Sequence, residues 1–215
     1  MNNINLAVKI ERAISELRRG GKIVMSDINS GMSLVLTAAE MIEFNTVDSL
    51  SKITSSRPNL ILSSNRANAL DLNSNNYPCS ILIEKLWTIN DILTLCMPLN
   101  DHPQPILNGV VFEKSNVISI CLLLLRQARL LPAGIMSLIS NVPLEKMNEW
   151  ASKNNIIHID TSDVTSFEKN NAERLSIAVR ARVPIAETDN CEVVIFRPKD
   201  GGNEHFCLLI GKSRY

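Results

Sequence analysis

The stretch from Ser115 to Ile139, SNVISICLLLLRQARLLPAGIMSLI, decides the fold. Up to Arg126 it is apolar on nearly every side, which predicts a helix that lies deep in the molecule. Ser115 can cap the start of this helix, and the Leu-Leu-Pro sequence that ends at Pro132 stops it. The segment GIMSLI (134–139) then predicts a buried strand. A buried helix followed at once by a buried strand is typical of an α/β domain.

The same alternation of helix and strand extends on both sides of this stretch. An apolar stripe from Leu6 to Leu17 predicts a first helix, and LVLTAAEMI (34–42) predicts a buried strand that can continue into a helix. The alternation predicts an α/β (α+β) domain over residues 1–171. Further strands are expected at 22–25, 60–64, 79–84, 109–112 and 156–159, and further helices at 48–53, 66–72, 88–95, 143–155 and from Asp160 or Thr161 to Lys169.

The pattern changes in the tail, residues 172–215. Three short apolar segments, at 176–185, 191–198 and 204–211, are separated by the turn sequences ETDN and KDGGN. Short turns between strands predict an antiparallel meander. Three strands form a marginal unit with an unprotected outer edge, so this second domain is expected to be an incomplete antiparallel β segment. We expect the free edge to be paired in a dimer or covered by the N-terminal domain.

Composition excludes several classes of function. The chain has 215 residues, 45% of them hydrophobic, and its formal net charge is +0. The chain has no cationic surplus that would favour binding to nucleic acid or to an anionic membrane. Aromatic residues, at 4%, are too few for base-stacking platforms. The N-terminus lacks the apolar core of a secretory signal, and the longest apolar run, Val117–Leu125, is too short for a bilayer, which takes about 20 residues. We therefore expect a soluble, cytoplasmic protein.

Residue patterns that carry chemistry are scarce. The five cysteines include no CxxC pair, which favours buried free thiols over disulfides or zinc ligands. None of the three histidines has metal-ligand spacing, and Glu204 beside His205 would project from the opposite face of a strand. The glycine pairs match no phosphate-binding loop. The remaining titratable candidates either stand alone in the sequence or are expected on a solvent-exposed face of a helix. They are Asp27, Glu40, Glu43, His102 and His158.

Several stretches nevertheless resemble known enzyme families. AISELRRGGKIVM (13–25), LVLTAAEMI (34–42) and LLLLRQARLLPAGIMSLI (122–139) resemble 3,4-dihydroxy-2-butanone 4-phosphate synthase of riboflavin biosynthesis. The tail from Leu175 to Gly211 resembles the opening strands of GTP cyclohydrolase II. The order is that of the bifunctional riboflavin enzymes. The match is nearest to a proteobacterial cyclohydrolase II type whose synthase-like domain is degenerate, and it implies the layered fold of the synthase.

The departures from the synthase pattern bear on activity. The family's acidic loop, DDEDRENEGD, reads SDINSGMS here and keeps only Asp27, and a lone carboxylate is a poor magnesium site. In the family's RxGHTEA motif, Lys114 takes the place of the arginine. The histidine, threonine and glutamate are replaced by Val117, Ile118 and Ser119, and Leu138 stands where a further glutamate is expected. The resemblance therefore implies that the synthase chemistry has been removed as a set.

The zinc site of GTP cyclohydrolase II is also not expected in this chain, for a different reason. That family binds catalytic zinc through three cysteines in a segment that the resemblance places beyond Tyr215, and Cys191 and Cys207 lie upstream of it. The sequence therefore predicts no catalytic, cofactor-binding or metal-binding residue in this chain, with zinc and magnesium expected only in intact relatives.

Three interpretations remain open. The first is a non-catalytic synthase-like domain that supports, positions or dimerises GTP cyclohydrolase II, with a homodimer and the cyclohydrolase catalytic domain as expected partners. The second is GTP cyclohydrolase II itself, of which this chain is a fragment. The third is a ligand-binding module in which Lys114 and Arg57 meet a phosphate.

Overall fold

The computed structural model describes residues 3–97, 103–112, 114, 116–173, 175–186, 188, 190–198 and 204–211. The chain divides into two compact units, Met1–Thr165 and Ser166–Tyr215. The boundary predicted after Asn171 lies within helix α7 (Thr161–Glu173), which this division crosses. Among the described residues, no helix combines the length and the apolar character that crossing a membrane requires.

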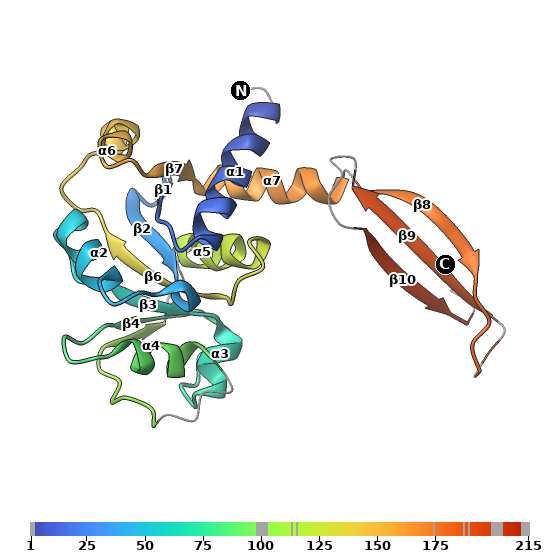
Figure 1. Ribbon diagram of the computed structural model, residues 1–215, viewed down its shortest axis with the longest axis horizontal. Helices are drawn as coiled ribbons and strands as arrows, with labels where there is room; N and C mark the ends of the chain where they lie inside the picture. Colours follow the sequence, from blue (N-terminus) through green and yellow to red (C-terminus); the bar gives the residue numbers. More distant parts are fainter. Residues whose placement is uncertain are drawn as a thin grey trace. The chain divides into compact units, whose positions relative to one another are not determined.

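The first unit is built on a seven-stranded mixed sheet with the strand order β5-β4-β3-β6-β2-β1-β7 (Figure 1). Neighbouring strands are antiparallel except β1 and β7, which are parallel. The strands are β1 (Ile23–Asp27), β2 (Met32–Ala38), β3 (Asn59–Leu62), β4 (Cys79–Leu82), β5 (Val110–Phe112), β6 (Ala133–Leu138) and β7 (Ile157–Asp160).

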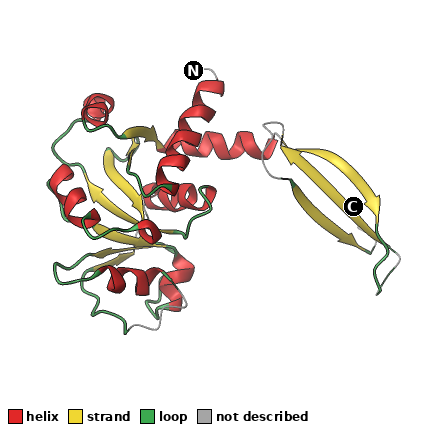
Figure 2. Ribbon diagram, in the orientation of Figure 1, coloured by secondary structure: helices red, strands yellow, loops and turns green. Residues whose placement is uncertain are grey.

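Helices cover both faces of this sheet (Figures 1 and 2). They are α1 (Asn3–Arg18), α2 (Thr46–Thr54), α3 (Ser64–Ala69), α4 (Ile89–Cys96), α5 (Asn116–Gln127), α6 (Met147–Lys153) and the start of α7, with short 3-10 helices η1 (Ala39–Met41) and η2 (Leu144–Lys146). One core cluster joins Val24 and Val35 of the sheet to α2, α3, α4 and α6. On the other face, α1 and α5 pack against each other and against β1 and β2. The central strands are buried on both faces, which explains their continuous apolar sequences.

The segment that decided the fold packs tightly. Seven residues of α5 are buried, and a side chain at Gly134 of β6 would lie only 2.9 Å from Leu36 Cδ1 and 3.0 Å from Leu125 Cδ1. Because Gly134 has no Cβ, α5 approaches the sheet closely at this point. The predicted buried helix, the buried strand after it and the α/β class are confirmed.

Two details of the expected elements differ. The continuation of the 34–42 strand is only the single turn η1, and the helix expected from Pro143 is divided into η2 and α6. The proposed cap at Ser115 lies outside the described residues.

The second unit contains the end of α7 and a three-stranded antiparallel sheet with the order β10-β9-β8. Its strands are β8 (Leu175–Arg182), β9 (Cys191–Pro198) and β10 (His205–Ile210). A shift in register between Ile177 and Val179 marks a bulge in β8. The predicted meander is confirmed, although its first strand ends at Arg182 instead of Ile185.

Candidate functional site

Asp27, the one acid kept from the acidic-loop position, lies at the end of β1 and is only 7% exposed. Its Oδ2 accepts hydrogen bonds from Ser30 Oγ at 2.6 Å and Ser30 N at 3.0 Å, and its Oδ1 accepts one from Thr161 Oγ1 at 2.7 Å. The hydrogen bond from the Ser30 hydroxyl is the largest influence on the pKa of Asp27, which lies below its ordinary value although burial opposes this. The carboxylate therefore closes the β1–β2 turn and holds the start of α7.

The replaced motif positions at the start of α5 have different surroundings. Val117 is 0% and Ile118 is 1% exposed, and both belong to the hydrophobic core, whereas Ser119 is exposed. Lys114 places its Nζ 5.6 Å from the centroid of the Tyr77 ring, a cation–π contact. Leu138, at the end of β6, is 40% exposed and lies opposite Leu34. None of these side chains except that of Lys114 offers a charge to a ligand.

Two other candidate groups take part in internal contacts. Glu40 Oε2 accepts a hydrogen bond from Leu131 N at 2.9 Å, which fixes the chain between α5 and β6. Glu204 Oε1 lies 2.6 Å from Arg197 Nη2, so its carboxylate pairs with Arg197, while its neighbour His205 is exposed. His102 lies outside the described residues.

His158 belongs to a polar chain that links β7 to α6 and β1. Its Nδ1 lies 2.5 Å from Asn148 Oδ1, its Nε2 lies 2.9 Å from Ser26 Oγ, and Ser26 Oγ lies 2.9 Å from Ser33 Oγ. Burial is the largest influence on the pKa of His158, which it lowers. A serine and a histidine in contact can form a nucleophilic pair, but Ser26 is only 2% exposed, which leaves no approach for a substrate.

Burial disfavours the thiolate form of three cysteines, Cys79, Cys96 and Cys121. All five cysteines are free, four are buried, and Cys207 is half-buried, so the expectation of burial is wrong for that residue. Burial raises the pKa of Cys79 to about 11 and that of Cys96 and Cys121 to about 12. Within the described part of the chain, no three His, Cys, Asp or Glu side chains converge in a way that could hold a metal ion.

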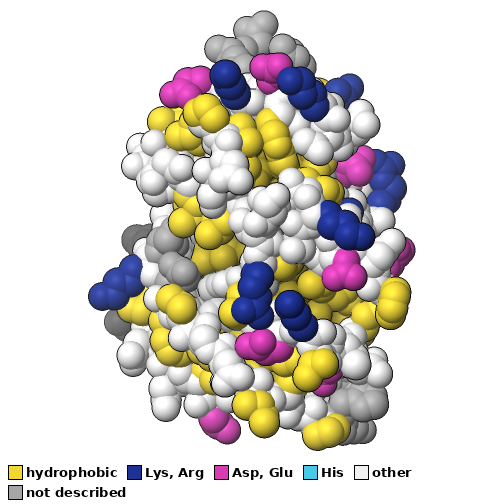
Figure 3. Space-filling view, turned by 90° about the vertical axis from the view of Figure 1, so that its left-hand side faces the viewer, with side chains coloured by type: hydrophobic (Ala, Val, Ile, Leu, Met, Phe, Trp, Pro, Cys, Tyr) yellow, Lys and Arg dark blue, Asp and Glu magenta, His cyan; other side chains and the backbone are white. Residues whose placement is uncertain are grey.

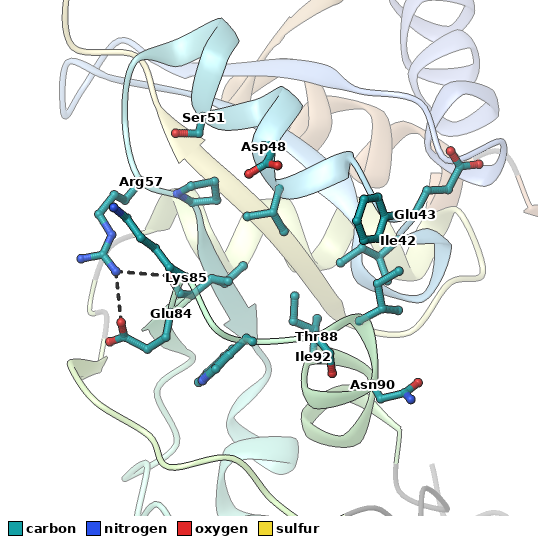
Figure 4. Close-up of a pocket in the computed structure, with 16 residues that line it drawn as sticks. Ile42, Glu43, Asp48, Ser51, Arg57, Glu84, Lys85, Thr88, Asn90 and Ile92 are labelled. Carbon is teal, nitrogen blue, oxygen red and sulfur yellow. Dashed lines mark hydrogen bonds and ion pairs between the residues drawn. The ribbon is translucent and has the colours of Figure 1, made fainter.

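One hollow of the first unit, which we call the Trp87 groove, has a volume of about 850 Å³. It lies between α2 and the loop that joins β4 to α4 (Figure 4). Its lining is apolar in the middle and charged at the rim. The lining residues that matter below are Phe44, Asp48, Arg57, Glu84, Lys85 and Trp87.

Capping interactions hold the α4 side of the groove. Thr88 Oγ1 accepts a hydrogen bond from Asp91 N at 3.3 Å, and Asp91 Oδ2 accepts one from Thr88 N at 2.6 Å, which together form a capping box. At the other end of α4, the guanidinium of Arg66 donates to the carbonyl oxygens of Thr94, Leu95 and Met97. Both ends of the helix are therefore fixed before any ligand binds.

The charges at the rim are partly paired. Arg57 Nη2 donates to Glu84 Oε2 at 3.2 Å and to Ile83 O at 3.4 Å (Figure 4). Lys85 lies beside this pair, and Asp48 and Ser51 project from α2 on the opposite side (Figure 4). Of the two cations in the phosphate-binding interpretation, Arg57 lines this groove and Lys114 is not among its lining residues.

The rim also carries large apolar side chains that are almost fully exposed. Phe44 is 94% exposed, and the adjoining hollow, which shares Arg57 and Trp87 with the groove, includes Leu86 at 93% and Ile106 at 81%. Figure 3 shows hydrophobic side chains interspersed with Lys, Arg, Asp and Glu on the left-hand face of Figure 1. Sequence reasoning named Arg57 and Glu43 of this region but did not join them, because the lining residues come from separate segments and no motif spacing connects them.

Comparison with known proteins gives relatives in sequence and in structure. No family model matches the sequence. The chain is 24% identical over 207 residues to a GTP cyclohydrolase-2 from Azospirillum brasilense, a match that covers 94% of this chain and 53% of that protein. The chain thus spans about half the length of this curated relative.

Solved structures give the fold. A two-domain 3,4-dihydroxy-2-butanone 4-phosphate synthase from A. baumannii superposes with a TM-score of 0.62 at 14% identity, covering 94% of this chain and 70% of that chain. The 3,4-dihydroxy-2-butanone 4-phosphate synthase of Candida albicans superposes with a TM-score of 0.59 at 19% identity, covering 74% and 96%. A cation-free synthase structure gives 0.61 at 16% identity, covering 76% and 98%. The chain therefore has the fold of 3,4-dihydroxy-2-butanone 4-phosphate synthase, and nearly its whole length is similar in sequence to a GTP cyclohydrolase-2.

Proposed function

We propose that this chain is a non-catalytic, synthase-like protein of riboflavin biosynthesis that supports GTP cyclohydrolase II. The observation that carries the proposal is the burial of Val117 and Ile118. These two positions hold a histidine and a threonine in the synthase motif, and here they are 0% and 1% exposed within the core. Side chains that stabilise the core at these positions cannot contact a substrate.

The remaining groups do not replace the missing chemistry. A magnesium-dependent rearrangement of a sugar phosphate needs oxygen ligands for the metal and groups that move protons at carbon. Asp27 already accepts three hydrogen bonds from Ser30 and Thr161. Leu138 supplies neither a ligand nor a proton. Synthase activity is therefore not expected from the side chains at these positions.

The surface supports a role in binding another protein. Phe44, Leu86 and Ile106 expose apolar area around the half-buried Trp87, and charged side chains surround them. Exposed apolar patches with a polar rim mark interaction sites, and Trp and Arg are enriched there. The cyclohydrolase catalytic domain is the partner that the sequence similarity suggests.

Synthase activity provides the first test. The chain is incubated with ribulose 5-phosphate and magnesium, and formate is measured against a no-protein control and an active synthase. We expect no formate above the control. Formate release that disappears in Lys114→Ala would overturn the proposal, because the loss would show that a relic site still binds substrate.

GTP cyclohydrolase II activity is the second candidate, favoured by the similarity over 94% of the chain. Elemental analysis for zinc and an assay of GTP turnover distinguish the two functions. The non-catalytic role predicts neither stoichiometric zinc nor a pyrimidine product. Both together would establish the enzyme instead.

Binding of a phosphate ligand is a third candidate, supported by Arg57 and Lys85 on one side of the Trp87 groove. Calorimetric titration with ribulose 5-phosphate, and with inorganic phosphate as a second ligand, would detect it. Binding that weakens in Arg57→Ala but not in Lys114→Ala would assign the ligand to this groove and not to the relic position.

A further inference from the structure

The loop that leads into β5 contains the one Asn-Gly pair in the sequence, Asn108–Gly109. Both residues are exposed and belong to no helix or strand, and β5 begins directly after them at Val110. Exposed segments without regular structure are reached by water and open locally at almost no cost in free energy. Asparagine is one of the chemically labile residue types, so this pair is open to reaction in the folded protein.

The two groups that would react are free in the structure. Toward the residues that the structure describes, neither the Asn108 side chain nor the Gly109 N–H forms a hydrogen bond. Gly109 has a φ of 65°, a conformation that glycine adopts without strain, and it has no Cβ beside its backbone nitrogen. The nitrogen is therefore both unpartnered among the described residues and unshielded on the side of Asn108.

We propose that Asn108–Gly109 is a self-modifying site, which converts Asn108 to an acid without an enzyme. Hydroxide removes the N–H proton of Gly109, and the nitrogen attacks Cγ of Asn108. A new C–N bond forms, the bond from Cγ to the side-chain nitrogen breaks, and ammonia leaves after taking a proton back from water. Water then opens the cyclic succinimide at either carbonyl, giving aspartate or isoaspartate. The net reaction consumes water and releases ammonia, and nothing is oxidised or reduced.

The new carboxylate joins a charged hollow. Asn108 lines the hollow that adjoins the Trp87 groove, and the other charged residues among its described lining are Arg57, Lys85, Glu84 and Asp91. Conversion of Asn108 changes this lining from balanced charge to an acidic surplus, which opposes the approach of anions. The modification therefore alters what this side of the Trp87 groove attracts.

Isoaspartate also lengthens the main chain between two anchored points. Leu107 packs against the core before the pair, and Val110 pairs with Ile81 of β4 after it. Because isoaspartate carries the chain through its Cβ, it adds a backbone atom between these anchors. β5 has only three residues and lies at the edge of the sheet, so its pairing with β4 is expected to weaken.

The test is peptide mapping by mass spectrometry, after the full chain has been incubated in neutral and in mildly alkaline buffer. Trypsin cleaves after Lys85 and Lys114, so Asn108 is carried by the peptide 86–114. We expect aspartate and isoaspartate at this position, and faster conversion at the higher pH. The rate should lie within roughly tenfold of that in a synthetic peptide of residues 106–111, because the folded loop needs little opening to react.

Asn90, in the same tryptic peptide, is the internal control. It lies in α4, and the backbone N–H that follows it, Asp91 N, already donates to Thr88 Oγ1 at 3.3 Å. Asn90 should therefore stay intact while Asn108 converts. Asn108→Gln is the matched variant: it keeps an exposed amide at this position, but its longer side chain would have to close a larger ring, so no product is expected over the same time.

The proposal is overturned if Asn108 stays intact after the synthetic peptide has converted, if Asn90 converts equally, or if the rate does not depend on pH. The effect on the sheet has its own measurement. In the isoaspartate fraction, separated by chromatography, amides of 110–112 should exchange hydrogen faster than in unconverted chain, and equal exchange would refute the weakening of β5. These outcomes are independent of the proposed function, because the reaction needs neither the synthase positions nor a partner protein.

Discussion

Ile118→Ala tests whether the start of α5 belongs to the core. The substitution removes three carbon atoms from a side chain that is 1% exposed. At about 0.8 kcal/mol for each buried methylene, the transfer term is about 2.5 kcal/mol, and the cavity left behind adds roughly 1 kcal/mol. We therefore expect the free energy of unfolding to fall by about 3–4 kcal/mol.

The assay is equilibrium urea unfolding followed by tryptophan fluorescence. Both tryptophans, Trp87 and Trp150, lie in the first unit, so the signal reports that unit. The midpoint should fall while the dependence on urea stays constant. Ser119→Ala is the control, because Ser119 is exposed on the same helix, and its effect should stay within about 0.5 kcal/mol. A loss below about 1 kcal/mol for Ile118→Ala, or equal losses for both variants, would refute the assignment of this position to a filled core.

Three further predictions concern the first unit. Gly134→Ala should lower the free energy of unfolding by about 1–3 kcal/mol, because the new methyl group would overpack against Leu36 and Leu125. The double variant Gly134→Ala with Leu125→Ala should lose less stability than the sum of the two single variants, and additive losses would contradict the contact. Folding lowers the pKa of His158, so this histidine stabilises the fold fully above its ordinary pKa of 6.5, and its contribution declines as pH falls below that value. His158→Gln should therefore flatten the dependence of stability on pH between about 7 and 5, and an unchanged slope would contradict this prediction. The pKa of Asp27 is also lowered, so Asp27→Asn should be less stable than the native chain at neutral pH, with the difference shrinking as pH falls below the ordinary pKa of 3.8; a constant difference in acid unfolding would contradict it.

Much of the secondary structure of this protein can be predicted from its sequence because the central strands are buried on both faces. Their apolar runs are continuous, and those of 34–38 and 134–139 stand out against polar turns. The change of pattern after α7 likewise predicts the meander, since turn residues separate three apolar segments at short spacing. Boundaries were less well predicted: the division of 143–155 into η2 and α6 depends on local packing that periodicity does not report.

The sequence alone also determined that the groups of the synthase motif are replaced, because that is a statement about residue types. Only the tertiary structure decided what the replacements do. Val117 and Ile118 enter the core while Ser119 stays in solvent, since successive helical residues point in different directions. The Trp87 groove joins segments far apart in the chain, and no local pattern connects them. The face of the second unit's sheet to which each side chain projects depends on the register of three strands, including a bulge in β8, and a shift of one residue would have moved Phe206 and Leu208 to the other face.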